Sequence, residues 1–206
     1  MSTETLLDRD VGPDKKTREN VLKGKVAIVI NDADGVGREI AEALVLEGVK
    51  GIIGTHPKKT REAGTRKVEK IKVTMGMNSW RISEPLNMAD PEDRERLREV
   101  QNISFNGELD ILILDDSGKT RENNNTGLNE LAGELLPYMK NGGRIVLLKS
   151  YSERDGEQSL TALIPKLEEK GVSLIMVYLP EVDDISVSDS SVGQKVVELL
   201  KQRIDN

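Results

Sequence analysis

The sequence predicts an α/β protein with a single domain built on a doubly wound parallel sheet of about six strands. Short apolar runs alternate with segments of helical periodicity along nearly the whole chain. The apolar runs are largely continuous, which is typical of parallel strands that helices cover on both faces. The chain has 206 residues, the length of one domain with a sizeable core.

The composition argues against several classes of protein. A net charge of −6 disfavours a nucleic-acid partner, because phosphate binding needs a basic surface. The absence of cysteine removes disulfide and thiol chemistry, and a single histidine argues against a metal site. No apolar run has the length of a membrane span, and the N-terminus lacks the apolar segment of a signal peptide. We therefore expect a cytoplasmic protein that binds neither metal, membrane nor nucleic acid.

The first 22 residues differ in composition from the rest of the chain. They mix charges of both signs with little apolar periodicity, so we expect residues 1–22 to form a flexible arm. Only Leu6, Leu7 and Val11 have the apolar character to dock. The folded domain is then predicted to span residues 23–206.

The first strand and helix of this domain form the most informative unit. Val26 to Ile30 is an apolar strand, a polar turn with Gly35 and Gly37 follows, and a helix runs from Arg38 to a stop at Gly48. The start of a helix leaves backbone N–H groups unpaired and carries a partial positive charge. Glycines let a pyrophosphate approach that backbone closely. The unit therefore indicates a dinucleotide-binding sheet.

The remaining elements follow in alternation. Gly51 to Pro57 is predicted as a strand, the basic segment 58–72 as a helix, 74–79 as a turn, and the segment with Trp80, Ile82 and Leu86 as the third strand. Asp90 is predicted as a helix N-cap, because Pro91 occupies the first helical position and acids follow. The later segments are helix 91–101, strand 109–114, helix 128–139, strand 144–148, helix 159–170, strand 172–178 and helix 192–204.

Five of these segments together resemble the short-chain dehydrogenase/reductase family, with gaps, over nearly all of residues 23–204. They are LKGKVAIVINDADGVGREIAEAL, LNMADPEDRERL, LDILILDDSG, LLPYMKNGGRIVLLKS and KLEEKGVSLIMVYLPEV. Their order matches the family's order from the first strand to the sixth. The resemblance implies a Rossmann-like fold, a bound NADP or NAD, and oxidoreductase ancestry.

The resemblance assigns the phosphate turn to residues 31–37. Ile30 and Asn31 replace the family's threonine and first glycine, while Gly35 and Gly37 are kept. Asp32 and Asp34 add negative charge beside a pyrophosphate, although Asp34 also fits a helix N-cap. The cofactor-binding residues expected in this turn are Asn31, Asp34, Gly35, Val36 and Gly37.

Further cofactor contacts are expected after the second, third and fourth strands. The second strand ends in His56 and Lys58 rather than an acid, which favours NADP over NAD, although a solvated basic helix start explains the cations equally well. We expect His56 to lie in a surface loop. The resemblance places Asn87 and Met88 at the adenine, and Ser117 and Gly118 at the nicotinamide ribose.

Two acids, Asp115 and Asp116, replace the asparagines that the family carries before Ser117 and Gly118. They could bind a cation or face water.

The catalytic residues of the family are only partly present. Ser150 aligns with its serine and Asn124 with its asparagine, but no Tyr-x-x-x-Lys pair occurs in the sequence. Tyr151 is the nearest candidate proton donor, although neighbouring residues of a strand alternate faces and would separate it from Ser150. The loops that hold substrate are also shorter than in the family, as in a shortened paralogue or a minimised domain.

Three hypotheses for function follow. The first is a protein of this family that binds NAD(P) but has weak or no redox activity, a pseudoenzyme acting as a regulatory or partner subunit. The second is an active NADP-dependent oxidoreductase with an atypical proton donor. The third is an interaction protein on a Rossmann-like scaffold that binds no dinucleotide.

The resemblance also implies a homodimer through helices 128–139 and 159–170. The leucines that could serve either the core or such an interface are Leu128, Leu131, Leu135 and Leu136.

Overall fold

The computed structural model describes residues 21–31, 35–57, 67–72, 78–116, 127–150, 160–179 and 190–202. In chain order the elements are β1 (Val26–Val29), α1 (Gly35–Leu46), β2 (Gly51–Pro57), β3 (Lys67–Lys72), β4 (Asn78–Leu86), α2 (Pro91–Phe105), β5 (Leu109–Asp116), α3 (Leu128–Leu135), η1 (Leu136–Tyr138), β6 (Met139–Ser150), η3 (Thr161–Leu163), α4 (Ile164–Lys170), β7 (Ser173–Leu179) and α5 (Ser190–Gln202).

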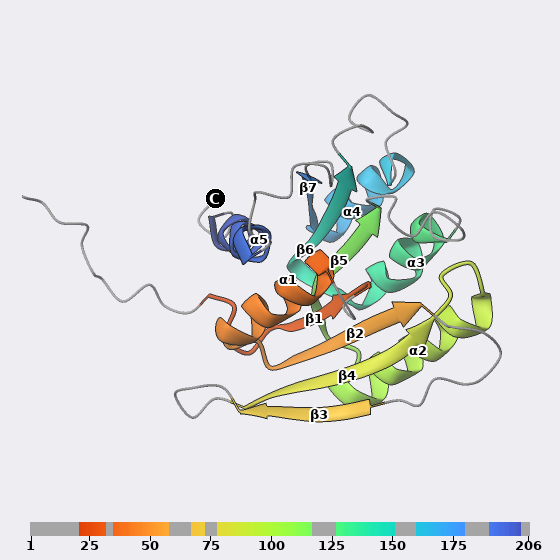
Figure 1. Cartoon of the computed structure of the whole chain (residues 1–206). Helices are drawn as coiled ribbons and strands as arrows, with labels where there is room; N and C mark the ends of the chain where they lie inside the picture. Colours follow the sequence, from red (N-terminus) through yellow and green to blue (C-terminus); the bar gives the residue numbers. More distant parts are fainter. Residues whose placement is uncertain are drawn as a thin grey trace, which may run out of the picture.

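The strands form one sheet in the order β3-β4-β2-β1-β5-β6-β7 (Figure 1). Six of the strands are parallel, which confirms the predicted doubly wound α/β fold. The chain passes outward from β1 through β2 to β4, then returns to β5 on the other side of β1. The strand order therefore reverses between β1 and β5, and this reversal creates a topological switch point.

Helices cover the sheet in two layers, and each layer encloses its own apolar cluster. On one face α1 and α5 pack over β1, β5, β6 and β7 through aliphatic residues such as Leu44 and Leu200. On the other face α2, α3 and α4 enclose the larger cluster, which includes Leu97 and Leu131. Strand residues alternate between the two clusters, as the two-residue period of a strand requires.

The last residue of the expected arm packs in the core. Leu22, which we assigned to the arm, is 2% exposed and belongs to the cluster under α1 and α5. Residues 1–20, including Leu6, Leu7 and Val11, lie outside the described residues.

The prediction of a helix over 58–72 is wrong for its second half. Residues 67–72 form β3, which pairs antiparallel with β4, so that Val68 lies opposite Ile82. The segment reads KVEKIK, and its two apolar residues, Val68 and Ile71, are three positions apart, so the sequence lacks the two-residue period of a strand. The lysines of this segment are the reason that we predicted a solvated helix. Residues 58–66 lie outside the described part.

Several helix boundaries also differ from the predictions. Helix α1 begins at Gly35 rather than Arg38, so Gly37 lies within its first turn. Helix α2 extends to Phe105 rather than residue 101, since its left-handed C-cap is Asn106, with φ 54°. Helix α3 ends at Leu135, because Pro137 introduces a 3-10 turn before β6 begins at Met139.

Two local predictions are confirmed. Asp90 is the N-cap of α2, where its side chain accepts a hydrogen bond from Glu92 N at 3.0 Å, and Pro91 follows it. Gly171 closes α4 in the left-handed conformation, with φ 67°. In the described part of the chain, no helix is long and apolar enough to cross a membrane.

The four leucines of uncertain role on α3 and η1 belong to the core. Leu128, Leu131, Leu135 and Leu136 are all buried in the cluster beneath α2, α3 and α4. Their apolar surface is therefore used within the protomer.

A substitution at Gly51 tests how tightly α2 packs against the sheet. An added Cβ would lie 2.1 Å from Cε1 of Phe105, a ring that is 4% exposed. We expect Gly51→Ala to lower the free energy of unfolding by about 1–3 kcal/mol, measured by urea denaturation. Adding Phe105→Leu should recover part of this loss, and two independent, additive losses would contradict the packing described here.

Candidate functional site

The candidate site lies at the carboxyl ends of the parallel strands, beside the switch point between β1 and β5. In open α/β sheets this crevice is where ligands bind, because the loops diverge to the two faces of the sheet there. The site is built from the turn after β1, the end of β2 and the turn after β4. The ends of β5 and β6 complete it (Figure 1).

The turn after β1 leaves the strand through Asn31, in the left-handed conformation with φ 60°. Asparagine tolerates this conformation better than most residues do. Asn31 N–H donates to Oγ1 of Thr55 at 3.2 Å, and Thr55 is 1% exposed on β2. The side-chain amide nitrogen of Asn31 is buried and has no hydrogen-bond partner among the described residues. The turn thus holds a buried donor at the end of β1.

Gly35 is the first residue of α1, and its backbone has a conformation that favours glycine. Its φ is +58°, and no atom of the described chain lies within 4 Å of an ideal Cβ built on it. The described residues therefore leave room for a ligand to approach the backbone at the start of α1 closely. Val36 is half-buried and Gly37 is buried in the same helical turn, whereas Asp32 and Asp34 lie outside the described residues.

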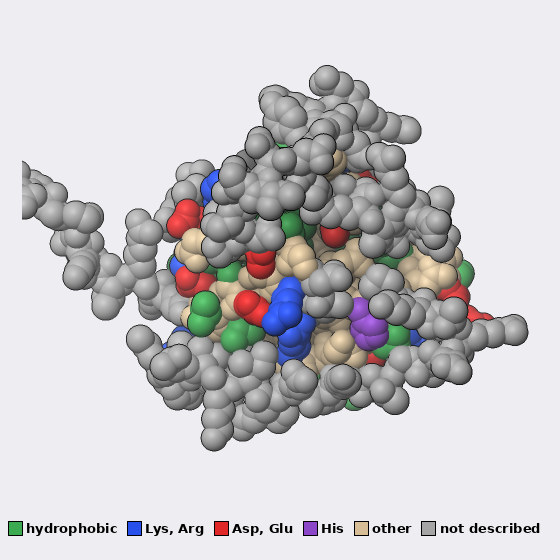
Figure 2. Space-filling model, in the orientation of Figure 1, with side chains coloured by type: hydrophobic (Ala, Val, Ile, Leu, Met, Phe, Trp, Pro, Cys, Tyr) green, Lys and Arg blue, Asp and Glu red, His purple; other side chains and the backbone are tan. Residues whose placement is uncertain are grey.

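His56 lies in β2 and not in a loop, which corrects the sequence-based expectation. It is half-buried, and its Nδ1 is 3.3 Å from Oγ of Ser83 on β4. Between β2 and β4 the described residues contain one element, the strand β3. Figure 2 shows Lys or Arg side chains near the middle of the visible face, with an Asp or Glu side chain against them, and the histidine to their right. Lys58 lies outside the described residues.

The turn after β4 is held in place by α2. Asn87 N–H donates to Oδ2 of Asp93 at 2.9 Å, and Asn87 Oδ1 accepts from Ala89 N at 3.2 Å. Nη1 of Arg94 donates to the backbone oxygen of Met88 at 2.7 Å. Because Asp93 is 1% exposed and Arg94 only 8% exposed, solvent competes little for the bonds that these two side chains make. Asn87 and Met88 therefore form a rigid platform at the site.

An ion-pair network supports this platform. Nε of Arg94 is 3.1 Å from Oε1 of Glu134 on α3, and Arg96 lies 2.6 Å from Glu84 and 2.9 Å from Asp93. Partial burial lowers the pKa of Arg96, but hydrogen bonds and charges from Glu84 and Asp93 outweigh it. The pKa of Arg96 therefore stands above its usual value, which keeps the guanidinium charged.

Gly127 completes the platform from the side of α3. With φ +145°, its Cα packs so closely on Met88 that an added Cβ would lie 2.2 Å from the Met88 carbonyl oxygen. Only glycine fits this contact. Sequence reasoning missed both Gly127 and Arg94, because the contacts that give them a role are distant in sequence.

The ends of β5 and β6 carry the residues nearest to the family's catalytic positions. Ser150 ends β6 and is half-buried. Asp116 lies opposite Lys149 in the sheet, and Lys149 Nζ is 3.9 Å from Asp116 Oδ2 with both side chains buried. Strand alternation places Lys149 on the α3 face and Ser150 on the α1 face, since Leu147 and Leu148 belong to different clusters.

The remaining expected site residues lie outside the described part of the chain. They are Ser117, Gly118, Asn124 and Tyr151. Of the two acids before Ser117, Asp116 pairs with a lysine of the protein itself. The Asp116–Lys149 pair was not predicted, although the strand register would have shown it.

Comparisons with known proteins find relatives of this chain. No family model matches it. The chain is 38% identical over 102 residues to the 3-oxoacyl-(acyl-carrier-protein) reductase FabG of Salmonella typhimurium, covering 50% of this chain and 37% of that protein. It is 24% identical over 163 residues to dehydrogenase/reductase SDR family member 4 of Rattus norvegicus, covering 78% of this chain and 51% of that protein. The chain thus spans about half or less of these relatives.

Solved structures share the fold. A short-chain dehydrogenase/reductase from Sinorhizobium meliloti superposes with a TM-score of 0.63 at 17% identity, covering 85% of this chain and 88% of that one. A double mutant of a short-chain dehydrogenase/reductase from Serratia marcescens superposes with a TM-score of 0.61 at 20% identity, covering 87% and 90%. The architecture of this chain is therefore similar to theirs over most of both lengths.

Proposed function

We propose that this chain, which belongs to the short-chain dehydrogenase/reductase family, binds NADP or NAD at the carboxyl edge of its sheet and has weak or no redox activity. The observation that carries the proposal is the open, glycine-dependent start of α1 at the switch point, with a buried amide donor of Asn31 beside it. A pyrophosphate would accept hydrogen bonds from these groups. The protein would then act as a regulatory or partner subunit.

The site's polar groups suggest how a dinucleotide would lie. Its pyrophosphate would meet the start of α1 at Gly35, and its adenine would rest on Asn87 and Met88. Because Asn87 Oδ1 already accepts from Ala89 N, the amide NH₂ is the group that would donate to the adenine. His56 stands at the end of β2, where a carboxylate would repel a 2′-phosphate and a histidine would not. These features favour NADP over NAD.

The residues present support cofactor binding better than proton transfer. The cofactor, when bound, would supply the hydride. The protein must move a proton, and the sequence has no Tyr-x-x-x-Lys pair to do so. Lys149 does not replace the missing lysine, because it is buried against Asp116 on the face away from Ser150. Weak or absent turnover is the expected consequence.

A redox assay tests this part of the proposal. With NADPH and a panel of aldehydes, ketones and 3-oxoacyl thioesters, we expect oxidation no faster than the background without protein. The same result is expected for Tyr151→Phe. Clear turnover that Tyr151→Phe abolishes would contradict the proposal, and would favour an active oxidoreductase with Tyr151 as its proton donor.

A matched pair of variants tests the role of Arg94 in the adenine platform. Arg94→Met removes the donor to the Met88 carbonyl and leaves Glu134 without that partner. We expect about tenfold weaker NADPH binding, since one buried charged hydrogen bond contributes roughly 1.5–3 kcal/mol. Lys140→Met is the control, because Lys140 pairs with Glu108 at 3.1 Å at the amino ends of β6 and β5, away from this turn. Equal affinities in the two variants, measured by fluorescence titration, would contradict the platform.

We also propose the homodimer through α3 and α4 that the resemblance implies. The leucines of α3 are used in the core, so any such interface would use exposed residues of the two helices, such as Glu130, Lys166 and Glu169. A polar interface of this kind weakens with salt. Light scattering at low and high ionic strength measures the fraction of dimer, which should fall as the salt concentration rises.

A further inference from the structure

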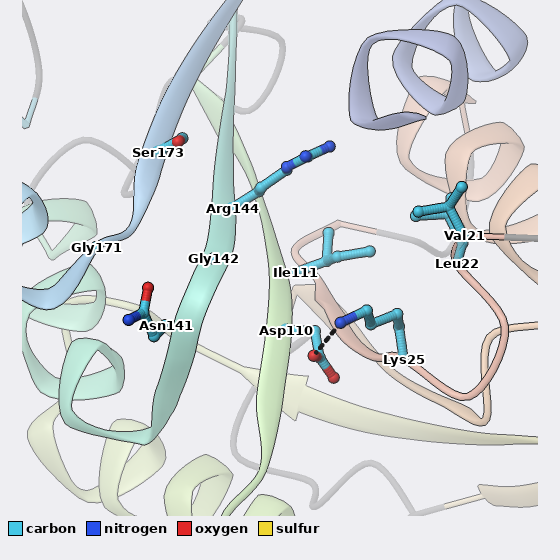
Figure 3. Close-up of a pocket in the computed structure, with 10 residues that line it drawn as sticks. All are labelled: Val21, Leu22, Lys25, Asp110, Ile111, Asn141, Gly142, Arg144, Gly171 and Ser173. Carbon is cyan, nitrogen blue, oxygen red and sulfur yellow. Dashed lines mark hydrogen bonds and ion pairs between the residues drawn. The ribbon is translucent and has the colours of Figure 1, made fainter. Parts of the chain in front are cut away.

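β7 is the last strand of the sheet, and among the described residues its outer edge has no partner strand. The strand order ends at β7, which pairs with β6 from Arg144↔Ser173 to Ser150↔Leu179. Figure 3 shows the amino ends of these two strands, with Ser173 at the start of β7 and Arg144 on β6. An edge strand directs a row of backbone N–H and C=O groups away from its sheet. β7 therefore offers hydrogen-bond donors and acceptors to a further strand.

The sequence of β7 lacks the features that usually prevent pairing at a sheet edge. It reads SLIMVYL, with no charged residue, no proline and no glycine, and all seven residues pair in regular register with β6. Protected edges instead carry lysines, prolines or bulges. Met176 is 41% exposed, which is high for a large apolar side chain in a strand. These properties are typical of a strand that pairs with another chain.

The other edge of the sheet is different in composition. It is formed by β3, which reads KVEKIK and has three lysines and one glutamate in six residues. Lysines on an edge strand disfavour pairing, because two copies would bring like charges together. The charges of β3 therefore protect its edge, and β7 has no such charges.

Side chains on both faces of β7 are only partly covered by the fold. Leu174 packs against the cluster beneath α2, α3 and α4, and strand alternation places Met176 and Tyr178 on the same face. Leu174 and Tyr178 are partly buried, and so is Val177 on the opposite face. A strand paired to β7 would cover these side chains and gain the free energy of apolar burial.

A second copy of the chain is the partner that fits this edge. Antiparallel pairing of two β7 strands about a two-fold axis at Met176 places Met176 opposite its own copy and Leu174 opposite the Tyr178 of the other chain. Every such pair is uncharged, so the contact avoids the repulsion expected between two chains of net charge −6. A contact of this symmetry also closes after two copies, whereas β7 paired to β3 would continue into a filament.

We propose that β7 pairs with the β7 strand of a second copy of this chain, antiparallel and centred on Met176, so that two sheets become one continuous sheet. The proposal does not rest on dinucleotide binding. It also differs from the polar dimer through α3 and α4, because an apolar strand pair persists at high salt.

The first experiment is light scattering of the full chain in about 1 M NaCl, where charges are screened over about 3 Å. We expect a monomer–dimer equilibrium with a dissociation constant in the micromolar range. Met176→Lys should weaken the dimer about tenfold or more, because it removes two apolar side chains from the axis and puts like charges opposite each other. Ile103→Lys is the matched control: Ile103 is 79% exposed on α2, over the other half of the sheet, and this variant should leave the dimer unchanged.

The second experiment uses the absence of cysteine from the chain, which makes Met176→Cys a protein with a single thiol. Directly opposite residues of an antiparallel pair have Cβ atoms about 4.5–5.5 Å apart, near the separation that a disulfide needs. Oxidised glutathione should therefore link two copies, with both thiols losing a proton and an electron and the glutathione disulfide being reduced to two thiols. Ile103→Cys should give little linked dimer under the same conditions.

Three results would overturn the proposal. The first is a chain that remains monomeric in high salt up to millimolar concentration, including a dimer that forms only at low salt. The second is equal dimerisation of Met176→Lys and Ile103→Lys. The third is disulfide-linked dimer that forms as readily from Ile103→Cys as from Met176→Cys.

Discussion

Gly127→Ala is expected to lower the free energy of unfolding by about 3 kcal/mol or more. An alanine Cβ at this position would lie 2.2 Å from the carbonyl oxygen and 2.5 Å from the carbonyl carbon of Met88. Backbone cannot rotate out of the way as a flexible side chain can, so the turn after β4 or the start of α3 must shift. The φ of +145° adds strain that a residue with a Cβ tolerates poorly. For a chain of this size the loss corresponds to a fall of roughly 6–12 °C in Tm.

Gly133→Ala is the matched control for Gly127→Ala. Gly133 is in the same helix, and its added Cβ would have Leu163 Cδ2 at 3.7 Å as its nearest neighbour, an ordinary contact. Alanine in a helix interior should leave stability unchanged or raise it by up to about 1 kcal/mol. The Tm values of both variants, measured by thermal unfolding, test this difference in stability. A stable Gly127→Ala protein would contradict the close packing of α3 on the Met88 turn.

The second large effect is expected on ligand binding rather than on folding. Gly35→Val should weaken NADPH binding by about a hundredfold, because the branched side chain would fill the space where the pyrophosphate approaches the start of α1. In the free protein no described atom lies within 4 Å of the new Cβ. The cost in stability is therefore limited to backbone strain at φ +58°, about 1–2 kcal/mol.

Gly24→Val is the control that distinguishes the cost of backbone strain from the loss of NADPH binding in Gly35→Val. Gly24 has a φ of +79°, and again no described atom lies within 4 Å of its added Cβ, but it precedes β1 at the other end of the sheet. Both variants should lose similar stability, and only Gly35→Val should lose NADPH affinity. Fluorescence titration measures the affinities and urea denaturation the stabilities. Equal NADPH affinities in the two variants would argue against a pyrophosphate at α1.

The fold could be predicted from the sequence wherever the signal was local. The continuous apolar run of β5 and the Asp90–Pro91 start of α2 each specify an element within a few residues. The order of such elements then limits the topology to a doubly wound sheet. The prediction failed at β3, where KVEKIK forms a strand by pairing with β4, a partner that local composition does not reveal.

Part of the candidate site could also be predicted, again where its residues are close together in the sequence. The turn from Asn31 to Gly35 is contiguous, so glycine placement indicates its shape. The support for Asn87 and Met88 is not contiguous: Arg94 reaches Glu134, forty positions away, and Gly127 packs on Met88 from another helix. Only the packed structure brings these groups together. The same holds for Asp116 and Lys149, which are neighbours in the sheet and distant in the chain.

The central claim is that the start of α1 at the switch point binds a dinucleotide. Titrating the purified chain into NADPH and into NADH, with cofactor fluorescence as the signal, tests it most directly. We predict saturable binding that is tighter for NADPH than for NADH. The absence of any binding at millimolar NADPH would contradict the claim and leave a layered scaffold without a nucleotide.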